Sequence, residues 1–175
     1  MKRMLSFLLV AMLVFPCPFS LAEAVYPNEG DLSVIRKTIK LLSDDGMVIT
    51  SSDYVLSSDE TGMLTARFPI CTGIDLSVSC RDGKTLSFIA SIDPQNKYAR
   101  LKYPTIYNYL LQTFFIDLDF NSAYEILYYL GSNLQPGELY DLGTSASLLK
   151  TGYEIKLFKT DYALILGIYP VDYNA

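Results

Sequence analysis

Residues 64–92 read LTARFPICTGIDLSVSCRDGKTLSFIASI, and this stretch decides the predicted fold. Apolar and polar residues alternate through 64–70, 74–80 and 86–92, which is the pattern of strands that bury one face. Asp82-Gly83 separates the last two segments and favours a tight hairpin turn, because glycine readily adopts positive φ. The stretch therefore predicts an antiparallel meander.

Helical patterns lie on both sides of this meander. Four apolar residues recur at helical spacing ahead of it, after a candidate cap at Asp31: Leu32, Ile35, Ile39 and Leu42. Two further helices are predicted at 106–116, where Pro104 suits the first turn, and at 121–130. Shorter apolar or alternating runs predict additional strands at 47–56, 98–103, 142–149, 153–158 and 162–169.

These elements predict an α+β fold, with an antiparallel sheet or two packed sheets and about three helices packed on one face. A helix followed by antiparallel strands occurs twice, before and after about residue 104. A degenerate duplication of a helix-plus-meander unit is one explanation of that order.

The first 24 residues have the composition of an export signal. Lys2 and Arg3 form a basic start, residues 4–15 are almost wholly apolar, and Ala22-Glu23-Ala24 supplies small residues for a signal peptidase. Cleavage there would leave residues 25–175 as a single exported domain. We expect the protein to be secreted or extracytoplasmic, in the periplasm or cell envelope.

Two membrane-attached alternatives are weaker. The apolar run is shorter than the roughly 20 residues that a bilayer span requires. Cys17 follows the run, but a lipidated cysteine needs a small residue before it, and Pro16 occupies that position. No stable membrane anchor is therefore expected.

Composition excludes several classes of function. The chain carries 14 Lys and Arg against 19 Asp and Glu and is interpreted as having no basic cluster, so neither nucleic acid nor an anionic membrane surface is an expected partner. It has no histidine, which excludes Ser-His-Asp and Cys-His catalysis and histidine-containing zinc sites. No catalytic residue, metal or cofactor is predicted.

Cys71 and Cys80 would remain after cleavage, and an even pair in an exported chain suggests a disulfide. A continuous strand would hold them roughly 30 Å apart at about 3.3 Å per residue. The bond therefore requires the chain to turn back between them, for example at Thr72-Gly73. The alternative is two unpaired thiols, one of them buried as a small apolar group.

Two short sequences match part of a known motif, but the residues around them do not fit that motif. Asp117, Asp119 and Asn121 have the spacing that opens an EF-hand, but the later positions of that loop do not match, so a helix junction capped by Asp119 or Asn121 is preferred. Ser147 and Lys150 form Ser-x-x-Lys within a predicted strand, where they would not act as nucleophile and base.

Tyrosine is abundant, with 14 residues, and aromatic side chains are dense between residues 107 and 129. We expect a non-enzymatic module that binds an extracytoplasmic protein, peptide or glycan, or a second copy of itself, through a Tyr-rich helical surface. The predicted contact residues are Tyr107, Tyr124, Tyr128 and Tyr129. Ordinary packing of these rings in the core is the competing interpretation.

The alternative function is a small histidine-free hydrolase with a paired-carboxylate site. Five turn-associated acidic residues are its candidates: Asp44, Asp45, Asp53, Asp59 and Glu60.

Overall fold

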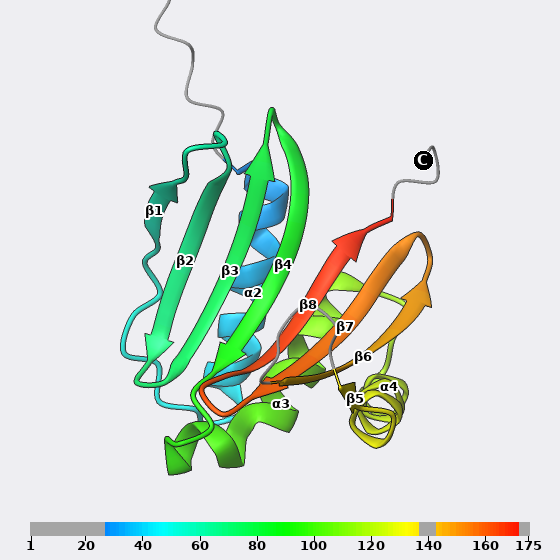
Figure 1. The fold of residues 1–175 in the computed structure, drawn as a ribbon. Coiled ribbons are helices and arrows are strands. Elements are labelled where there is room, and N and C mark those ends of the chain that lie inside the picture. The colour runs from blue at the N-terminus through cyan, green and yellow to red at the C-terminus, as the bar shows by residue number, and fades with distance from the viewer. Residues whose placement is uncertain (1–26, 137–142, 172–175) are drawn as a thin grey trace, which may run out of the picture.

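A computed structural model of the chain describes residues 27–136 and 143–171, so the predicted export signal lies outside the described residues. Within those ranges, three helices accompany an eight-stranded antiparallel sheet, which confirms the α+β prediction (Figure 1). The helices are α2 (Glu29–Asp44), α3 (Lys97–Phe114) and α4 (Phe120–Ser132). The strands are β1 (Val55–Ser58), β2 (Leu64–Cys71), β3 (Ile74–Arg81), β4 (Lys84–Ile92), β5 (Gln135–Pro136), β6 (Gly143–Lys150), β7 (Tyr153–Thr160) and β8 (Leu164–Pro170).

The sheet consists of two four-stranded halves that meet at β4 and β8. Its strand order is β1-β2-β3-β4-β8-β7-β6-β5, so each half is a meander and the last strand of each lies at the centre. The seam between the halves pairs Phe88 with Ile168, Ala90 with Leu166 and Ile92 with Leu164. Because a helix precedes each meander, the order of elements agrees with a repeated helix-plus-meander unit.

The meander predicted from residues 64–92 is present as β2, β3 and β4. Asp82 and Gly83 both have positive φ, at 50° and 73°, which matches the twist that a two-residue hairpin turn needs. Thr151 and Gly152 repeat this geometry between β6 and β7, at 47° and 81°. The two halves of the sheet therefore use the same kind of tight turn.

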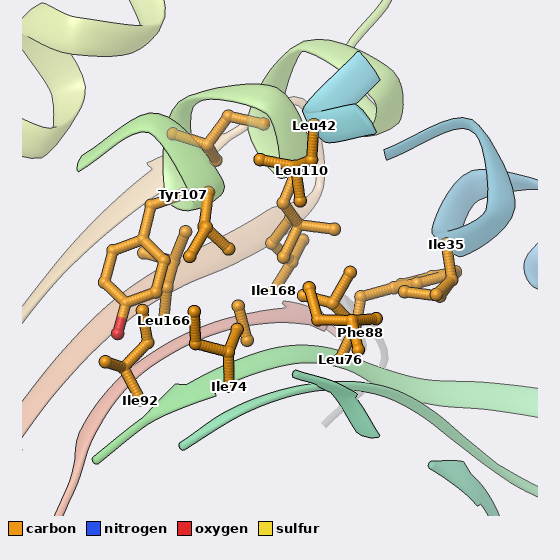
Figure 2. Close-up of a cluster of buried hydrophobic side chains, with 14 of the residues drawn as sticks. Ile35, Leu42, Ile74, Leu76, Phe88, Ile92, Tyr107, Leu110, Leu166 and Ile168 are labelled. Carbon is orange, nitrogen blue, oxygen red and sulfur yellow. The ribbon is translucent and has the colours of Figure 1, made fainter. Parts of the chain in front are cut away.

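All three described helices pack on one face of the sheet, as predicted (Figure 1). The core between the layers is built from alternate strand residues, such as Leu76 and Leu166, and from the inner faces of the helices, such as Ile35 and Leu110 (Figure 2). These four side chains are fully buried. Burial of apolar area at roughly 25 cal/mol per Å² is the main stabilising contribution to such a core.

Tyr107 on α3 joins the helical layer to the seam of the sheet. Its side chain is completely buried, and its hydroxyl donates a hydrogen bond of 2.5 Å to the carbonyl oxygen of Leu164 in β8 (Figure 2). Burial raises the pKa of the Tyr107 phenol well above its usual value of 10.0. The neutral phenol thus gives its own hydroxyl and the Leu164 carbonyl oxygen a hydrogen-bond partner in an otherwise apolar region.

The strand predicted at 47–56 is present only at its end, where residues 55 and 56 begin β1. Residues 47–54 have no regular secondary structure, and β1 begins at Val55. Met47 is nevertheless buried, and the backbone N–H of Thr50 donates to the carbonyl oxygen of Ile70 at 2.7 Å. Residues 47–54 are therefore held by the burial of Met47 and by one backbone hydrogen bond to β2, without the series of hydrogen bonds that defines a strand.

The prediction of a strand at 98–103 was wrong, because α3 already begins at Lys97. Asn96 caps the helix by accepting a hydrogen bond from the backbone N–H of Ala99 at 3.1 Å. Pro104 consequently lies inside the helix instead of in its first turn, although an interior proline removes a helical hydrogen bond. Buried contacts of Ala99 and of the later turns hold this helix together despite that loss.

The apolar strand predicted near residues 162–169 is β8 and is central, but the described helices cover only one of its faces (Figure 1). On the opposite face, a hollow of about 290 Å³ is lined by Ile89, Phe158, Thr160, Ile165 and Tyr169. A Cβ atom at Gly167 would come within 2.4 Å of the Tyr169 ring. Glycine at this position therefore lets the aromatic ring lie close against the strand.

Replacement of Tyr107 by Phe should lower the free energy of unfolding by about 1–2 kcal/mol at pH 7, because the Leu164 carbonyl loses its buried donor. Urea unfolding of both proteins measures this difference. Since the folded-state pKa of Tyr107 is raised, its stabilisation is complete below pH 10 and declines as the pH rises further. The gap between wild type and Tyr107→Phe should therefore narrow above pH 10, and a constant gap would contradict this assignment.

Candidate functional site

The helix α4 carries the most conspicuous exposed aromatic group in the described chain. Asp119 caps it by accepting a hydrogen bond from the backbone N–H of Ser122 at 2.7 Å, as the helix-junction interpretation predicted. Hydrogen bonds from Ser122 lower the pKa of the Asp119 carboxyl. The cap thus stabilises the start of the helix that presents the aromatic side chains.

One side of α4 is fixed to the rest of the protein. Ala123 and Leu130 are fully buried, and Ile126 and Leu127 pack against the core. Ile126 and Leu127 lie three and four residues after Ala123, and Leu130 lies three residues after Leu127, so the four share one face of the helix. They place α4 against α3, β6 and β7.

The other side of α4 is aromatic and accessible. Phe120, Tyr124 and Tyr128 recur every four residues, so they form a stripe, whereas Tyr129 lies beside this stripe, about 100° round the helix from Tyr128. Their exposed fractions are 50%, 52%, 70% and 48%, respectively. We call these four residues the α4 aromatic surface. Large apolar groups grouped on an exposed helix face are typical of a contact surface.

A buried polar contact sets the position of α4 relative to α3. Asn108 is completely buried, and its side-chain amide donates to the carbonyl oxygen of Phe120 at 2.9 Å. Gln112 in turn donates to the Asn108 carbonyl oxygen. The Phe120 ring also contacts Tyr109, with centroids 6.5 Å apart. The aromatic surface therefore begins at a point that the core holds in place.

The structure separates the four predicted contact tyrosines into two groups. Tyr124, Tyr128 and Tyr129 lie together on α4, whereas Tyr107 is in the core and bonded to β8. The expectation that Tyr107 lies on an exposed surface was wrong, because its face of α3 points at the sheet. Phe120 belongs to the aromatic surface but was missed as a contact residue. Its four-residue spacing from Tyr124 and Tyr128 was the signal that could have identified it.

No disulfide joins Cys71 and Cys80. Cys71 ends β2 and pairs with Ile74 next to the turn, while Cys80 pairs with Leu64 at the far end of the same hairpin. The turn at Thr72-Gly73 does bring the chain back, but in a register that keeps the two cysteines apart. Burial raises the pKa of both thiols, which makes them weaker nucleophiles at neutral pH.

The five candidate carboxylates do not gather in one pocket. Asp44 and Asp53 line an open groove of about 680 Å³ between α2 and residues 49–53. The Asp44 carboxylate is bound to the Lys40 ammonium at 2.5 Å, and both side chains are largely exposed. Asp45 is the C-terminal cap of α2, and Glu60 is exposed in the turn after β1.

Asp59 has a structural role in the turn after β1. Its carboxylate accepts hydrogen bonds from the hydroxyl and backbone N–H of Thr61 and from the backbone N–H of Met63, at 2.7, 2.8 and 3.0 Å. These bonds lower its pKa, the Thr61 hydroxyl contributing most. An ionised carboxylate committed to backbone donors is typical of an Asx turn.

The two motif-like strings have ordinary surroundings. Asp117 forms an ion pair with Lys150 at 3.3 Å, and Asp119 is the helix cap described above. Ser147 and Lys150 point to opposite faces of β6, as strand alternation requires. Among residues 27–136 and 143–171, His, Cys, Asp and Glu form no cluster of three that could hold a metal ion. Within the same ranges, no helix is both long enough and apolar enough to cross a bilayer.

No family model matches the chain, and no curated protein or solved structure shows significant similarity to it. The function proposed below therefore depends on the residues of this chain.

Removal of the two exposed rings should leave the fold intact. The Tyr124→Ser/Tyr128→Ser variant is expected to unfold within about 1 kcal/mol of wild type, since each exposed substitution contributes only about 0.5 kcal/mol. The matched control on the buried face of α4 is Leu130→Ala, which should cost about 2–5 kcal/mol. Chemical denaturation of the three proteins measures both effects. If the serine variant lost as much unfolding free energy as Leu130→Ala, the two rings would be part of the packed core and not of an exposed surface.

Proposed function

We propose that this protein is an exported, non-enzymatic binding module that contacts its partner through the α4 aromatic surface. The observation that carries the proposal is the grouping of Phe120, Tyr124, Tyr128 and Tyr129 on a helix whose buried face is already complete. These rings contribute apolar area that the fold leaves in contact with water. A partner that covers them would recover the corresponding hydrophobic free energy.

The chemistry of this surface suits recognition by contact. Tyrosine combines a flat apolar ring with a hydroxyl that can donate or accept a hydrogen bond. Across α4, Glu125 is the single charged residue, so little charge must be desolvated when a partner binds. The partner classes that fit are an extracytoplasmic protein, a peptide or a glycan, and a second copy of this chain is also compatible.

The fixed position of α4 favours binding without a large ordering cost. Leu130 and Ala123 are buried beneath the surface, and Asn108 holds the first turn through the Phe120 carbonyl. A surface that is already ordered loses less conformational entropy on association. Its side chains present a preformed stripe to the partner.

A histidine-free hydrolase is the alternative proposal, supported by the presence of both Asp44 and Asp53 along one groove. The groove is open, and the Asp44 carboxylate is bound by Lys40, so it lacks the enclosed apolar setting that tunes a general acid. Turnover of a glycoside by the purified protein, abolished by Asp53→Asn with an unchanged fold, would favour the enzyme. We expect no such turnover.

The binding proposal predicts that the rings of α4 determine what the protein captures. Protein purified from the exported fraction is immobilised and exposed to the native extracytoplasmic fraction. Captured species are identified by quantitative mass spectrometry, and glycans by carbohydrate analysis. Tyr124→Ala/Tyr128→Ala should lower recovery of a specific partner at least tenfold, because loss of hot-spot tyrosines commonly costs about 2 kcal/mol or more.

Tyr162→Ala is the matched control, because Tyr162 is 74% exposed but lies in the turn between β7 and β8. Its recovery of partner should equal that of wild type. Equal recovery by the α4 double variant, with its fold intact, would remove this surface from the binding site. Sedimentation of each protein alone shows whether the captured partner is a second copy of the chain.

A further inference from the structure

A second exposed surface lies at the start of α3, at the other end of that helix from α4. Residues 97–103 precede Pro104 and include three basic side chains, of which Lys97 and Arg100 are exposed and Lys102 is half-buried. Between them stand Tyr98 and Leu101, which are 40% and 68% exposed. We call these five residues the α3 basic tip.

Among residues 27–136 and 143–171, no carboxylate forms an ion pair with the three cations of the α3 basic tip. The ion pairs among the described residues use Arg36, Lys40, Arg67 and Lys150. The nearby Asp93 carboxylate accepts a hydrogen bond from the backbone N–H of Gln95 instead. The first turn of α3 contains no acidic residue, although the helix dipole favours acids there. The described fold therefore neutralises none of these three side chains by a direct ion pair.

The tip is held rigidly and projects from the molecule. Ala99 is fully buried beneath it, and the side chain of Asn96 both caps α3 and donates to the carbonyl oxygen of Thr72 at 3.0 Å. Figure 1 shows this start of α3 extending beyond the ends of β2 and β3 at the bottom of the view. Leu101 is four residues from Lys97 and three from Tyr98, so all three share one face of the helix.

We propose that the α3 basic tip is a reversible docking site for an anionic phospholipid bilayer. Leu101 and Tyr98 supply a small apolar and aromatic insertion at headgroup depth, where tyrosine is favourable. Lys97, Arg100 and Lys102 surround this insertion and pair with lipid phosphates. Charge complementarity selects a bilayer over an uncharged apolar partner, and the projecting position lets a flat surface reach the tip.

The acidic remainder of the chain orients this contact. The whole chain has a formal net charge of −5, so other faces are repelled by an anionic surface while the tip is attracted. The sequence-based prediction of no anionic membrane partner assumed that the chain has no basic cluster, and it overlooked the three cations within residues 97–102. Because three cations are fewer than the four to eight typical of strong lipid-binding clusters, the attachment is weak and sensitive to salt.

Vesicle sedimentation tests the proposal with protein purified from the exported fraction. The vesicles are phosphatidylcholine alone or phosphatidylcholine mixed with phosphatidylglycerol, at low and physiological salt. We expect binding to the mixed vesicles at low salt, weakened by added salt. Lys97→Gln/Arg100→Gln/Lys102→Gln should lower partitioning at least about tenfold. Leu101→Ser should lower it while leaving the net charge unchanged.

Lys37→Gln/Lys84→Gln/Lys159→Gln is the matched control, because it removes the same charge from three exposed lysines elsewhere. It should partition like wild type, as should Tyr124→Ala/Tyr128→Ala, which separates this site from the α4 aromatic surface. Circular dichroism verifies that each variant is folded. Absence of wild-type binding, equal binding to both vesicle types, or equal loss in the control triple would overturn the proposal. Binding to poly-glutamate but to neither vesicle type would also overturn it and assign an acidic polypeptide as the partner.

Discussion

The antiparallel pairing of β4 with β8 is the contact on which the rest of this structure depends. It joins two meanders that are distant in sequence into one sheet, and it places Leu164 under the hydroxyl of Tyr107. α3 spans the connection between the halves, so its orientation follows from that seam. The two helices α3 and α4 form the connection between β4 and β5. The start of α3 lies at one end of this connection, and α4 lies at the other. The two exposed surfaces are thus consequences of how the halves meet.

Local sequence patterns were sufficient for much of the fold. Alternation in residues 64–92 and the Asp82-Gly83 turn predicted β2, β3 and β4, since each strand buries one face. The same reasoning failed at residues 98–103, where a strand was predicted from a short stretch. The buried positions at Ala99, Ile106 and Leu110 belong to one continuous helix that runs through Pro104. Pro104 is typical of a helix start, and the helix boundary was therefore predicted there. In the structure, packing of α3 against the sheet outweighs the hydrogen bond that Pro104 removes from the helix.

The candidate site was predicted in part, for reasons visible in two tyrosines. Tyr107 and Tyr128 both lie in helices rich in apolar residues, yet one is fully buried and the other is 70% exposed. Their difference arises from which side of each helix meets the sheet, and this depends on long-range strand pairing. The cysteines illustrate the same limit, because the register of β2 on β3 determines that Cys80 lies opposite Leu64. The residue types thus indicated that the chain has aromatic side chains able to contact a partner. Tertiary packing determined which of these side chains are exposed.

The outermost strands cover only part of the strands next to them. In the described part of the chain, β5 pairs with Thr144 and Ser145 alone, so no described strand lies beside residues 146–150 of β6. The backbone of this part of β6 is therefore a place on the described sheet where an added strand could form a ladder of several hydrogen bonds.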